Sequence, residues 1–188
     1  MKVDQDFASL DTERLVLRRS RPDDAETISG YRSDPEVHRH QGWERTDAEE
    51  VRQQIDEMAG RPPGEPGGWV QLSVVERKSG SLIGDVGLSP ADGEPGVMKL
   101  GYTIAPASQG SGYATEAVSA LVSYAFETLE ADVVRVYAST DNIPSIRVAE
   151  KAGLRLIERF EGRDGDEVWS AVRYESDAAL WRSQMGKT

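Results

Sequence analysis

The stretch APASQGSGYATEAV, residues 105–118, changes character within a few positions. Its first half is rich in glycine and hydroxyl side chains and carries no charge, whereas its second half begins a regular apolar pattern. Apolar residues between Ala114 and Leu129 recur at the spacing i, i+3, i+4, i+7, which predicts an amphipathic helix. We therefore expect a glycine-containing loop that leads directly into the N-terminus of a long helix.

This loop has the features of an anion site. The first four backbone N–H groups of a helix are unpaired, and the helix dipole places roughly half a positive charge beside them. Gly110 and Gly112 let the backbone approach a ligand closely, because glycine has no Cβ. A phosphate group suits this arrangement, and a turn that merely starts the helix is the alternative.

Two common phosphate loops do not match the stretch. A P-loop ends in Gly-Lys-Ser/Thr, whereas Gly112 is followed by Tyr113. A dinucleotide fingerprint needs a third glycine where this chain has Thr115, and it normally lies in the first unit of a parallel sheet. Nucleotide hydrolysis is therefore not expected, and a dinucleotide-binding protein is the weaker alternative.

Strand patterns lie on both sides of the loop. The turns KSGS and PADGEPG divide residues 69–105 into three successive strands, which predicts an antiparallel meander. A buried-type strand follows the long helix, and a hairpin around RDGD closes the pattern. The expected strands are 14–19, 69–77, 82–89, 97–105, 132–140, 154–162 and 166–175.

Helix signals fill the remaining segments. Pro22 opens a first helix over 21–34, and Thr46 with Glu49 forms a capping-box pattern before a second. Residues 143–153 form a short helix ended by a glycine, and the tail 174–185 forms another that packs by Leu180 and Trp181. The element order predicts an α+β (mixed α/β) fold in one domain over residues 1–188, with a largely antiparallel sheet and one βαβ step.

Composition narrows the classes of partner. The net charge of −11 and the pI near 4.7 argue against nucleic acid, which needs a basic face. The absence of cysteine removes disulfides and thiolate ligands, so no metal site is expected. The start of the chain lacks the apolar core of a signal peptide and no apolar run has membrane-spanning length, so we expect a cytoplasmic protein without a membrane partner.

With its flanks, the opening stretch resembles the acyl-CoA signature of the GCN5-related N-acetyltransferase (GNAT) superfamily. The match rests on Gln109, Gly112 and Ala114 in the loop. A second match, STDNIPSIRVAEKAGL, resembles the family's Asn-x-x-Ser segment and its Lys-x-Gly ending. The segment TERLVLRRSRPDDAE is similar to the start of the ribosomal-protein N-terminal acetyltransferase branch, and together the matches span about 9–176.

The resemblance implies a fold, a co-substrate and its contacts. The family fold is a six- to seven-stranded, mostly antiparallel sheet with splayed central strands and flanking helices. Acetyl-CoA would be the co-substrate, with its pyrophosphate on the loop N–H groups and its pantetheine arm along the open strand edge. The implied donor-binding residues are Tyr102, Thr103, Ile104, Gln109, Gly110, Ser111, Gly112, Tyr113, Ala114, Thr115, Asn142 and Ser145.

The implied reaction is direct attack of a neutral amine on the thioester. The Ile104 N–H is the expected donor to the oxyanion. Many family members place a tyrosine acid where this chain has Ala149, so Ser145 is the expected proton donor to the thiolate. A serine that merely starts a helix beside Pro144 is the alternative.

The sequence leaves the general base and the acceptor substrate open. The branch commonly has a glutamate where this chain has Lys99, and Asp85 is a speculative base, with an outward-facing aspartate as the alternative. The resemblance implies that His38, His40 and Trp43 lie in a segment that lines the acceptor site, and ordinary surface histidines are the alternative. The acceptor is a protein N-terminus or a small amine such as an antibiotic or polyamine, in a monomer or homodimer. A catalytically silent acyl-CoA-binding module is the other possibility.

Overall fold

The computed structural model describes residues 1–41, 47–164 and 167–185. The strands are β1 (Ser9–Asp11), β2 (Leu15–Arg19), β3 (Val70–Glu76), β4 (Leu82–Pro90), β5 (Val97–Ile104), β6 (Val133–Ser139), β7 (Arg155–Asp164) and β8 (Glu167–Asp177). The helices are α1 (Ala25–Arg32), α2 (Pro35–His38), α3 (Ala48–Met58), α4 (Tyr113–Glu127), α5 (Ile143–Lys151) and α6 (Ala178–Met185), with 3-10 turns η1 (Pro22–Asp24) and η2 (Pro106–Ser108).

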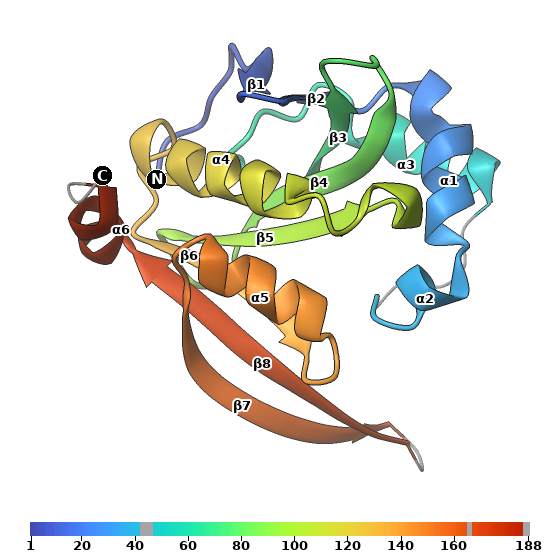
Figure 1. Ribbon diagram of the computed structural model, residues 1–188. Helices are drawn as coiled ribbons and strands as arrows, with labels where there is room; N and C mark the ends of the chain where they lie inside the picture. The colour runs from blue at the N-terminus through green and yellow to red at the C-terminus, as the bar shows by residue number, and fades with distance from the viewer. Residues whose placement is uncertain (42–46, 165–166, 186–188) are drawn as a thin grey trace.

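In the described part of the chain the strands form one eight-stranded sheet, in the order β1-β2-β3-β4-β5-β6-β8-β7. Neighbouring strands are antiparallel except β5 and β6, which run parallel on either side of the α4 crossover. Helices α4 and α5 cover one face of the sheet, and α1 and α3 lie on the other (Figure 1). The expected mixed α/β fold with a mostly antiparallel sheet is confirmed.

Some details of the expected elements are wrong. The expected six to seven strands are too few, because the three-residue edge strand β1 is too short to show an alternating pattern. Helix α3 is capped by Asp47 rather than by Thr46, which lies outside the described residues: the Asp47 carboxylate accepts the Glu50 N–H at 2.9 Å. The short α2 was not expected, and the tail helix begins only at Ala178, because β8 continues to Asp177.

Helix α4 packs against the main hydrophobic core. Its inward residues are fully buried or nearly so, in agreement with the spacing in the sequence, and they meet side chains of β2 to β6. A smaller core on the opposite face joins α1 and α3 to the sheet. The two cores therefore hold α4 on one face of the sheet and α1 with α3 on the other.

The central strands β5 and β6 separate along their length. Their parallel ladder pairs Val97 with Val133 and ends where Leu100 pairs with Val136. Beyond that point β5 continues to Ile104 beside β4 only, and β6 continues to Ser139 beside β8 only. The splay expected between the central strands is therefore confirmed, and it leaves one edge of each strand without a strand partner.

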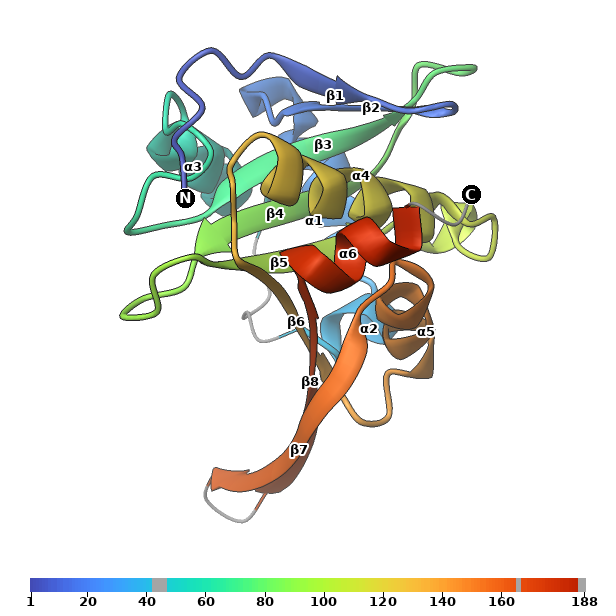
Figure 2. The same cartoon turned by 90° about the vertical axis from the view of Figure 1, so that its left-hand side faces the viewer.

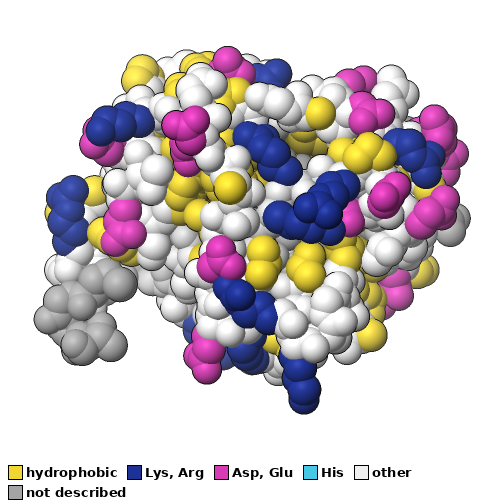
Figure 3. All heavy atoms as spheres, turned by 90° about the horizontal axis from the view of Figure 1, so that it is seen from above, with side chains coloured by type: hydrophobic (Ala, Val, Ile, Leu, Met, Phe, Trp, Pro, Cys, Tyr) yellow, Lys and Arg dark blue, Asp and Glu magenta, His cyan; other side chains and the backbone are white. Residues whose placement is uncertain are grey.

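The β7–β8 hairpin extends beyond the body of the molecule, past α5 (Figure 2). In the tail helix, the expected packing of Trp181 is confirmed, because its ring centroid lies 5.4 Å from that of Phe126. Ala178, rather than the expected Leu180, also packs against the core. Acidic and basic side chains are interspersed over the face seen in Figure 3, with hydrophobic side chains between them. Among the described residues, no helix is long and apolar enough to cross a membrane.

Candidate active site

A cavity of about 570 Å³ lies where β5 and β6 separate. Its walls come from the ends of β5 and β6, the loop before α4, one side of α5, and residues of the α2 segment on the opposite face. Of the residues expected to bind the donor, these line it: Tyr102, Thr103, Ile104, Gln109, Gly110, Gly112, Tyr113, Ala114, Thr115, Asn142 and Ser145. The structure therefore brings together two sequence motifs that are separated along the chain.

The loop meets the cavity at the start of α4. Gly112 is the N-cap residue with φ 82°, a left-handed conformation that glycine adopts without a Cβ penalty. No side-chain cap hydrogen bond occupies this helix end within the described structure, so its first N–H groups can bind a ligand. Ser111, although expected among the donor residues, is not part of the cavity wall.

The end of β5 presents backbone groups to the opening. The Ala105 N–H donates to the Ile83 carbonyl of β4 at 2.9 Å. Because hydrogen-bonded and non-hydrogen-bonded pairs alternate along an antiparallel ladder, the next pair, Ile104 and Gly84, is a non-hydrogen-bonded pair. The Ile104 backbone therefore points away from β4, toward the open side. Its carbonyl accepts from Gln109 Nε2 at 2.9 Å, which ties the loop to the strand end.

Tyr102 and Ser145 meet across the cavity between β5 and α5. The Tyr102 hydroxyl lies 2.8 Å from the Ser145 carbonyl and 2.9 Å from Ser145 Oγ. Burial raises the pKa of Tyr102 to about 12, so its phenol stays protonated at ordinary pH. Asn142 caps α5 by accepting the Ser145 N–H at 3.1 Å, which fixes where the serine lies.

The opposite end of the cavity is lined by the α2 segment. The His40 side chain is 11% exposed, and its Nδ1 lies 3.6 Å from Asp141 Oδ1. Gln41 Nε2 donates to Thr103 Oγ1 at 3.0 Å, which fastens this segment to the end of β5. His40 thus lines the cavity on the side of α2, and its Nε2 accepts a hydrogen bond from Arg39 Nε at 3.1 Å.

Asp85 is placed differently from His40. It is 2% exposed and does not line the cavity. Its carboxylate accepts hydrogen bonds from the Tyr31 hydroxyl, from Arg32 Nη2 at 3.1 Å and from Gln71 Nε2. Burial and the nearby Asp85 carboxylate raise the pKa of Tyr31 well above its usual value, so the phenol remains a donor. These hydrogen bonds give Asp85 a structural role, because they join strand β4 to α1 and β3.

Two other expected acceptor residues, Lys99 and His38, also lie outside the cavity wall. The Lys99 ammonium lies 5.7 Å from the Trp69 ring centroid and 3.9 Å from Asp92 Oδ2. His38 ends α2 and does not line the cavity. Trp43 lies outside the described residues.

Three cations from the described part of the chain line the cavity, although the whole chain is acidic. Arg147 and Lys151 are four residues apart on α5, and Arg39 lies on the α2 segment. The i, i+4 spacing could have shown the α5 pair in the sequence, because such residues share one helix face. A helix N-terminus, an open strand edge and several cations are a fitting set for the phosphates and amides of CoA.

Comparisons with known proteins agree with this geometry. The family model for the acetyltransferase (GNAT) domain matches residues 14–155. The chain is 30% identical over 165 residues to a Bacillus licheniformis protein named uncharacterized N-acetyltransferase p20, covering 82% of this chain and 90% of that protein.

Solved structures share the fold. A GNAT-family acetyltransferase from Bacillus anthracis superposes with a TM-score of 0.81 at 24% identity, covering 91% of this chain and 99% of that one. RimL, a ribosomal L7/L12 alpha-N-protein acetyltransferase solved in complex with coenzyme A, gives 0.77 at 14% identity, covering 92% and 99%. Fold and cavity together define an acetyltransferase built around two separating strands. The chain belongs to the GNAT acetyltransferase family and is an acetyl-CoA-dependent N-acetyltransferase.

Proposed function

We propose that the protein transfers an acetyl group from acetyl-CoA to the N-terminal amine of a polypeptide by direct attack. The observation that carries the proposal is a cavity that passes between β5 and β6 and continues into an exposed row of aromatic side chains. The donor enters at the α4 and α5 side, and the acceptor enters from the side of α2.

The donor is held by both sides of the splay. The N–H groups of residues 110–115 bind the pyrophosphate, and the free backbone edge from Tyr102 to Ile104 pairs with the pantetheine arm. Asn142 still has its amide NH₂ group to donate, because its cap uses only the side-chain oxygen. Arg147 and Lys151 add positive charge beside the phosphates.

Three groups of the chain then act on the reacting atoms. The Ile104 N–H donates to the developing oxyanion. Ser145, beside Tyr102, donates to the leaving sulfur. His40 accepts the proton of the attacking amine, because it lines the cavity and a neutral imidazole can serve as a general base.

The aromatic row begins at the cavity wall. Tyr137 lines the cavity, and its ring centroid lies 6.0 Å from that of Phe160. Phe160 in turn lies 6.2 Å from Trp169 in an edge-on contact. Tyr137 and Trp169 are 46% and 48% exposed, so the row can contact a partner.

The row lies on the face of the hairpin that is turned away from α5. Phe160 pairs with Ala171 and Gly162 with Trp169, and side chains two residues apart share one face of a strand. Tyr174, one position out of phase, points the other way, and its hydroxyl donates to Glu150 of α5 at 3.0 Å. A chain leaving the cavity can therefore follow the row.

The charges at the acceptor end favour a peptide over a polyamine. Among the described residues of the cavity wall, the carboxylates are Glu36 and Asp141. Glu36 pairs with Arg39 at 3.2 Å, and Asp141 faces His40. A multiply charged amine needs free carboxylates in its site.

The test compares acceptors that share one N-terminal residue but differ in length. We expect CoA release from acetyl-CoA to rise about tenfold in kcat/KM from the amino-acid amide to an octapeptide, since each aromatic contact contributes about 0.5–1.5 kcal/mol. Trp169→Ser should remove most of the gain for the octapeptide and leave the amide unchanged. Leu156→Ser is the matched control, because Leu156 is 41% exposed but pairs with Tyr174 on the opposite face.

Three outcomes would contradict the proposal at different levels. Preferred turnover of spermidine or an aminoglycoside would establish a small-amine acceptor in its place. An equal loss for Leu156→Ser would remove the role of the row. Absence of acetyl-CoA binding by calorimetry up to millimolar concentration would contradict the donor site itself.

The Tyr102–Ser145 contact predicts how substitutions of these two residues affect proton donation to the leaving thiolate. Ser145→Ala should lower kcat about tenfold with little change in KM for acetyl-CoA, since one hydrogen bond to the leaving thiolate is lost. Tyr102→Phe should lower kcat less, and the double variant should be no worse than Ser145→Ala. Steady-state kinetics over pH 6 to 9 checks this, and fully additive losses would show that the two groups act separately.

A further inference from the structure

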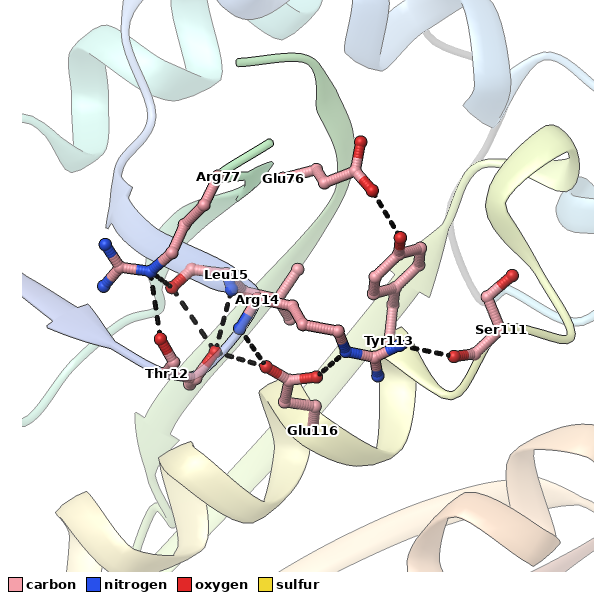
Figure 4. A network of polar contacts seen from close by, with 8 residues as sticks. All are labelled: Thr12, Arg14, Leu15, Glu76, Arg77, Ser111, Tyr113 and Glu116. Carbon is pink, nitrogen blue, oxygen red and sulfur yellow. Dashed lines mark hydrogen bonds and ion pairs between the residues drawn. The ribbon is translucent and has the colours of Figure 1, made fainter. Parts of the chain in front are cut away.

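Arg14 joins the edge of the sheet to the loop before α4 (Figure 4). Its Nη1 donates to the Ser111 carbonyl at 3.0 Å, and its Nε donates to Glu116 Oε2 at 2.6 Å. The backbone N–H of Arg14 donates to the other carboxylate oxygen of Glu116 at 2.8 Å. One residue of the β1–β2 turn therefore contacts both the loop and the first turn of the helix.

Glu116 is an unfavourable residue for a site that binds an anionic donor. Its carboxylate lies in the first turn of α4, near the N–H groups assigned to the pyrophosphate. Burial opposes its ionisation, but hydrogen bonds from Thr12 and Arg14 outweigh burial and hold the pKa of Glu116 below its usual value. The carboxylate is therefore charged at neutral pH and would repel the phosphates unless a cation cancels it.

Ser111 presents a second difficulty for an anion. Gly110 and Gly112 line the cavity, whereas Ser111 between them does not. A carbonyl oxygen turned inward would repel a phosphate oxygen, because both are hydrogen-bond acceptors. The bond from Arg14 holds the Ser111 carbonyl on the side away from the cavity.

The guanidinium is itself held in place. It lies over the Tyr113 ring at 4.6 Å from the centroid, and the Tyr113 hydroxyl donates to Glu76 of β3. Its Nη2 lies 3.4 Å from the position that a Cβ on Gly112 would occupy. A planar group with two directed hydrogen bonds and one ring contact fits here, and a lysine would provide only the charge.

We propose that Arg14 is a positioning residue for the acetyl donor, which keeps the Ser111 carbonyl out of the pyrophosphate site and cancels the charge of Glu116. The proposal rests on the donor-loop assignment in the proposed function. It goes beyond that assignment because Arg14 lies outside the cavity wall and acts only through the loop and the helix.

The experiment uses two donors that differ in the phosphates. Acetyl-CoA carries the pyrophosphate and S-acetylpantetheine does not. Arg14→Ala should raise KM for acetyl-CoA, and the calorimetric Kd for CoA, about tenfold, with kcat unchanged. KM for S-acetylpantetheine should stay within about twofold of wild type, since that donor does not reach the loop.

Two further variants separate charge from geometry. Arg14→Ala combined with Glu116→Gln should recover CoA affinity to within about threefold of wild type, because the uncancelled charge is gone. Arg14→Lys should lie between wild type and alanine, since it restores charge but not the directed bonds.

Arg77→Ala is the matched control. Arg77 is 40% exposed against 42% for Arg14, pairs with Asp11, and donates to the Thr12 carbonyl at 2.9 Å. It supports the same turn without touching the loop or α4, so its variant should keep the wild-type Kd for CoA. Thermal unfolding of each variant shows how much stability the turn has lost.

Different results would contradict the role of Arg14, the charge argument and the donor-loop assignment. Equal losses for both donors, or an equal loss in Arg77→Ala, would reduce Arg14 to a structural residue and overturn the proposal. A double variant as weak as Arg14→Ala would overturn the charge argument. If wild-type protein binds neither acetyl-CoA nor CoA, the donor-loop assignment fails, and the proposal fails with it.

Discussion

Replacing Gly112 with valine should raise the Kd for acetyl-CoA about a hundredfold or more, the largest effect expected of a single change in the donor site. Gly112 has φ 82°, where a residue with a Cβ costs roughly 1–2 kcal/mol and a β-branched one costs more. The new side chain would also meet Arg14 Nη2 at 3.4 Å and project beside the first N–H groups of α4. The loop must then change shape at the point where the pyrophosphate binds.

Calorimetry with acetyl-CoA measures this effect, and Gly93→Val is its control. Gly93 has φ 71° in the β4–β5 turn, lies outside the cavity wall, and has no other described atom within 4 Å of the position that a Cβ would occupy. Its valine variant should carry a similar backbone cost and lose stability, yet bind acetyl-CoA normally. Wild-type affinity in Gly112→Val would refute the placement of the pyrophosphate at this loop.

Gly84→Ala should destabilise the protein by about 3 kcal/mol and lower kcat about tenfold. A Cβ on Gly84 would lie 2.3 Å from the Thr103 carbonyl oxygen and 3.0 Å from Ile104 Cα. Backbone atoms cannot move aside as a flexible side chain can, so β4 and β5 must separate there. The displaced part of β5 carries the Ile104 N–H that we assign to the oxyanion.

Urea unfolding and steady-state kinetics measure the two effects separately. Gly101→Ala is the comparison for stability, because among the described residues its Cβ would meet only Trp69, at 3.6 Å, which is an ordinary contact. We expect it to cost less than about 1 kcal/mol. Wild-type stability in Gly84→Ala would show that the end of β5 tolerates movement, and the oxyanion assignment would lose its support in backbone geometry.

Much of the donor site was predictable because its signals are local. The glycine loop and the periodic helix lie within about 25 consecutive residues, and their chemistry follows from a helix N-terminus alone. Asn142 and Ser145 were expected from the resemblance to the family's Asn-x-x-Ser segment, and in the structure Asn142 accepts the Ser145 N–H. The resemblance then joined the two segments, and the splay of β5 and β6 places both on one cavity.

The acceptor side was less predictable, because the environment of a strand side chain depends on which other elements pack against that strand. Asp85 was expected either to face the cleft or to point outward, yet it is buried where Tyr31 and Arg32 of α1 contact it. Its partners Tyr31, Arg32 and Gln71 lie 54, 53 and 14 residues away along the chain. The contacts of Lys99 and of the aromatic row likewise depend on strand pairing.

Local sequence was therefore sufficient for seven of the eight strands in the described part of the chain, the long helix and the loop that suits a phosphate. Turn residues and side-chain spacing act within a few positions and need no distant partner. Only the tertiary structure decided that His40 and not Asp85 lines the cavity, and that Arg14 meets Glu116 from 102 residues away. Those outcomes depend on which faces pack together, and packing is a property of the whole chain.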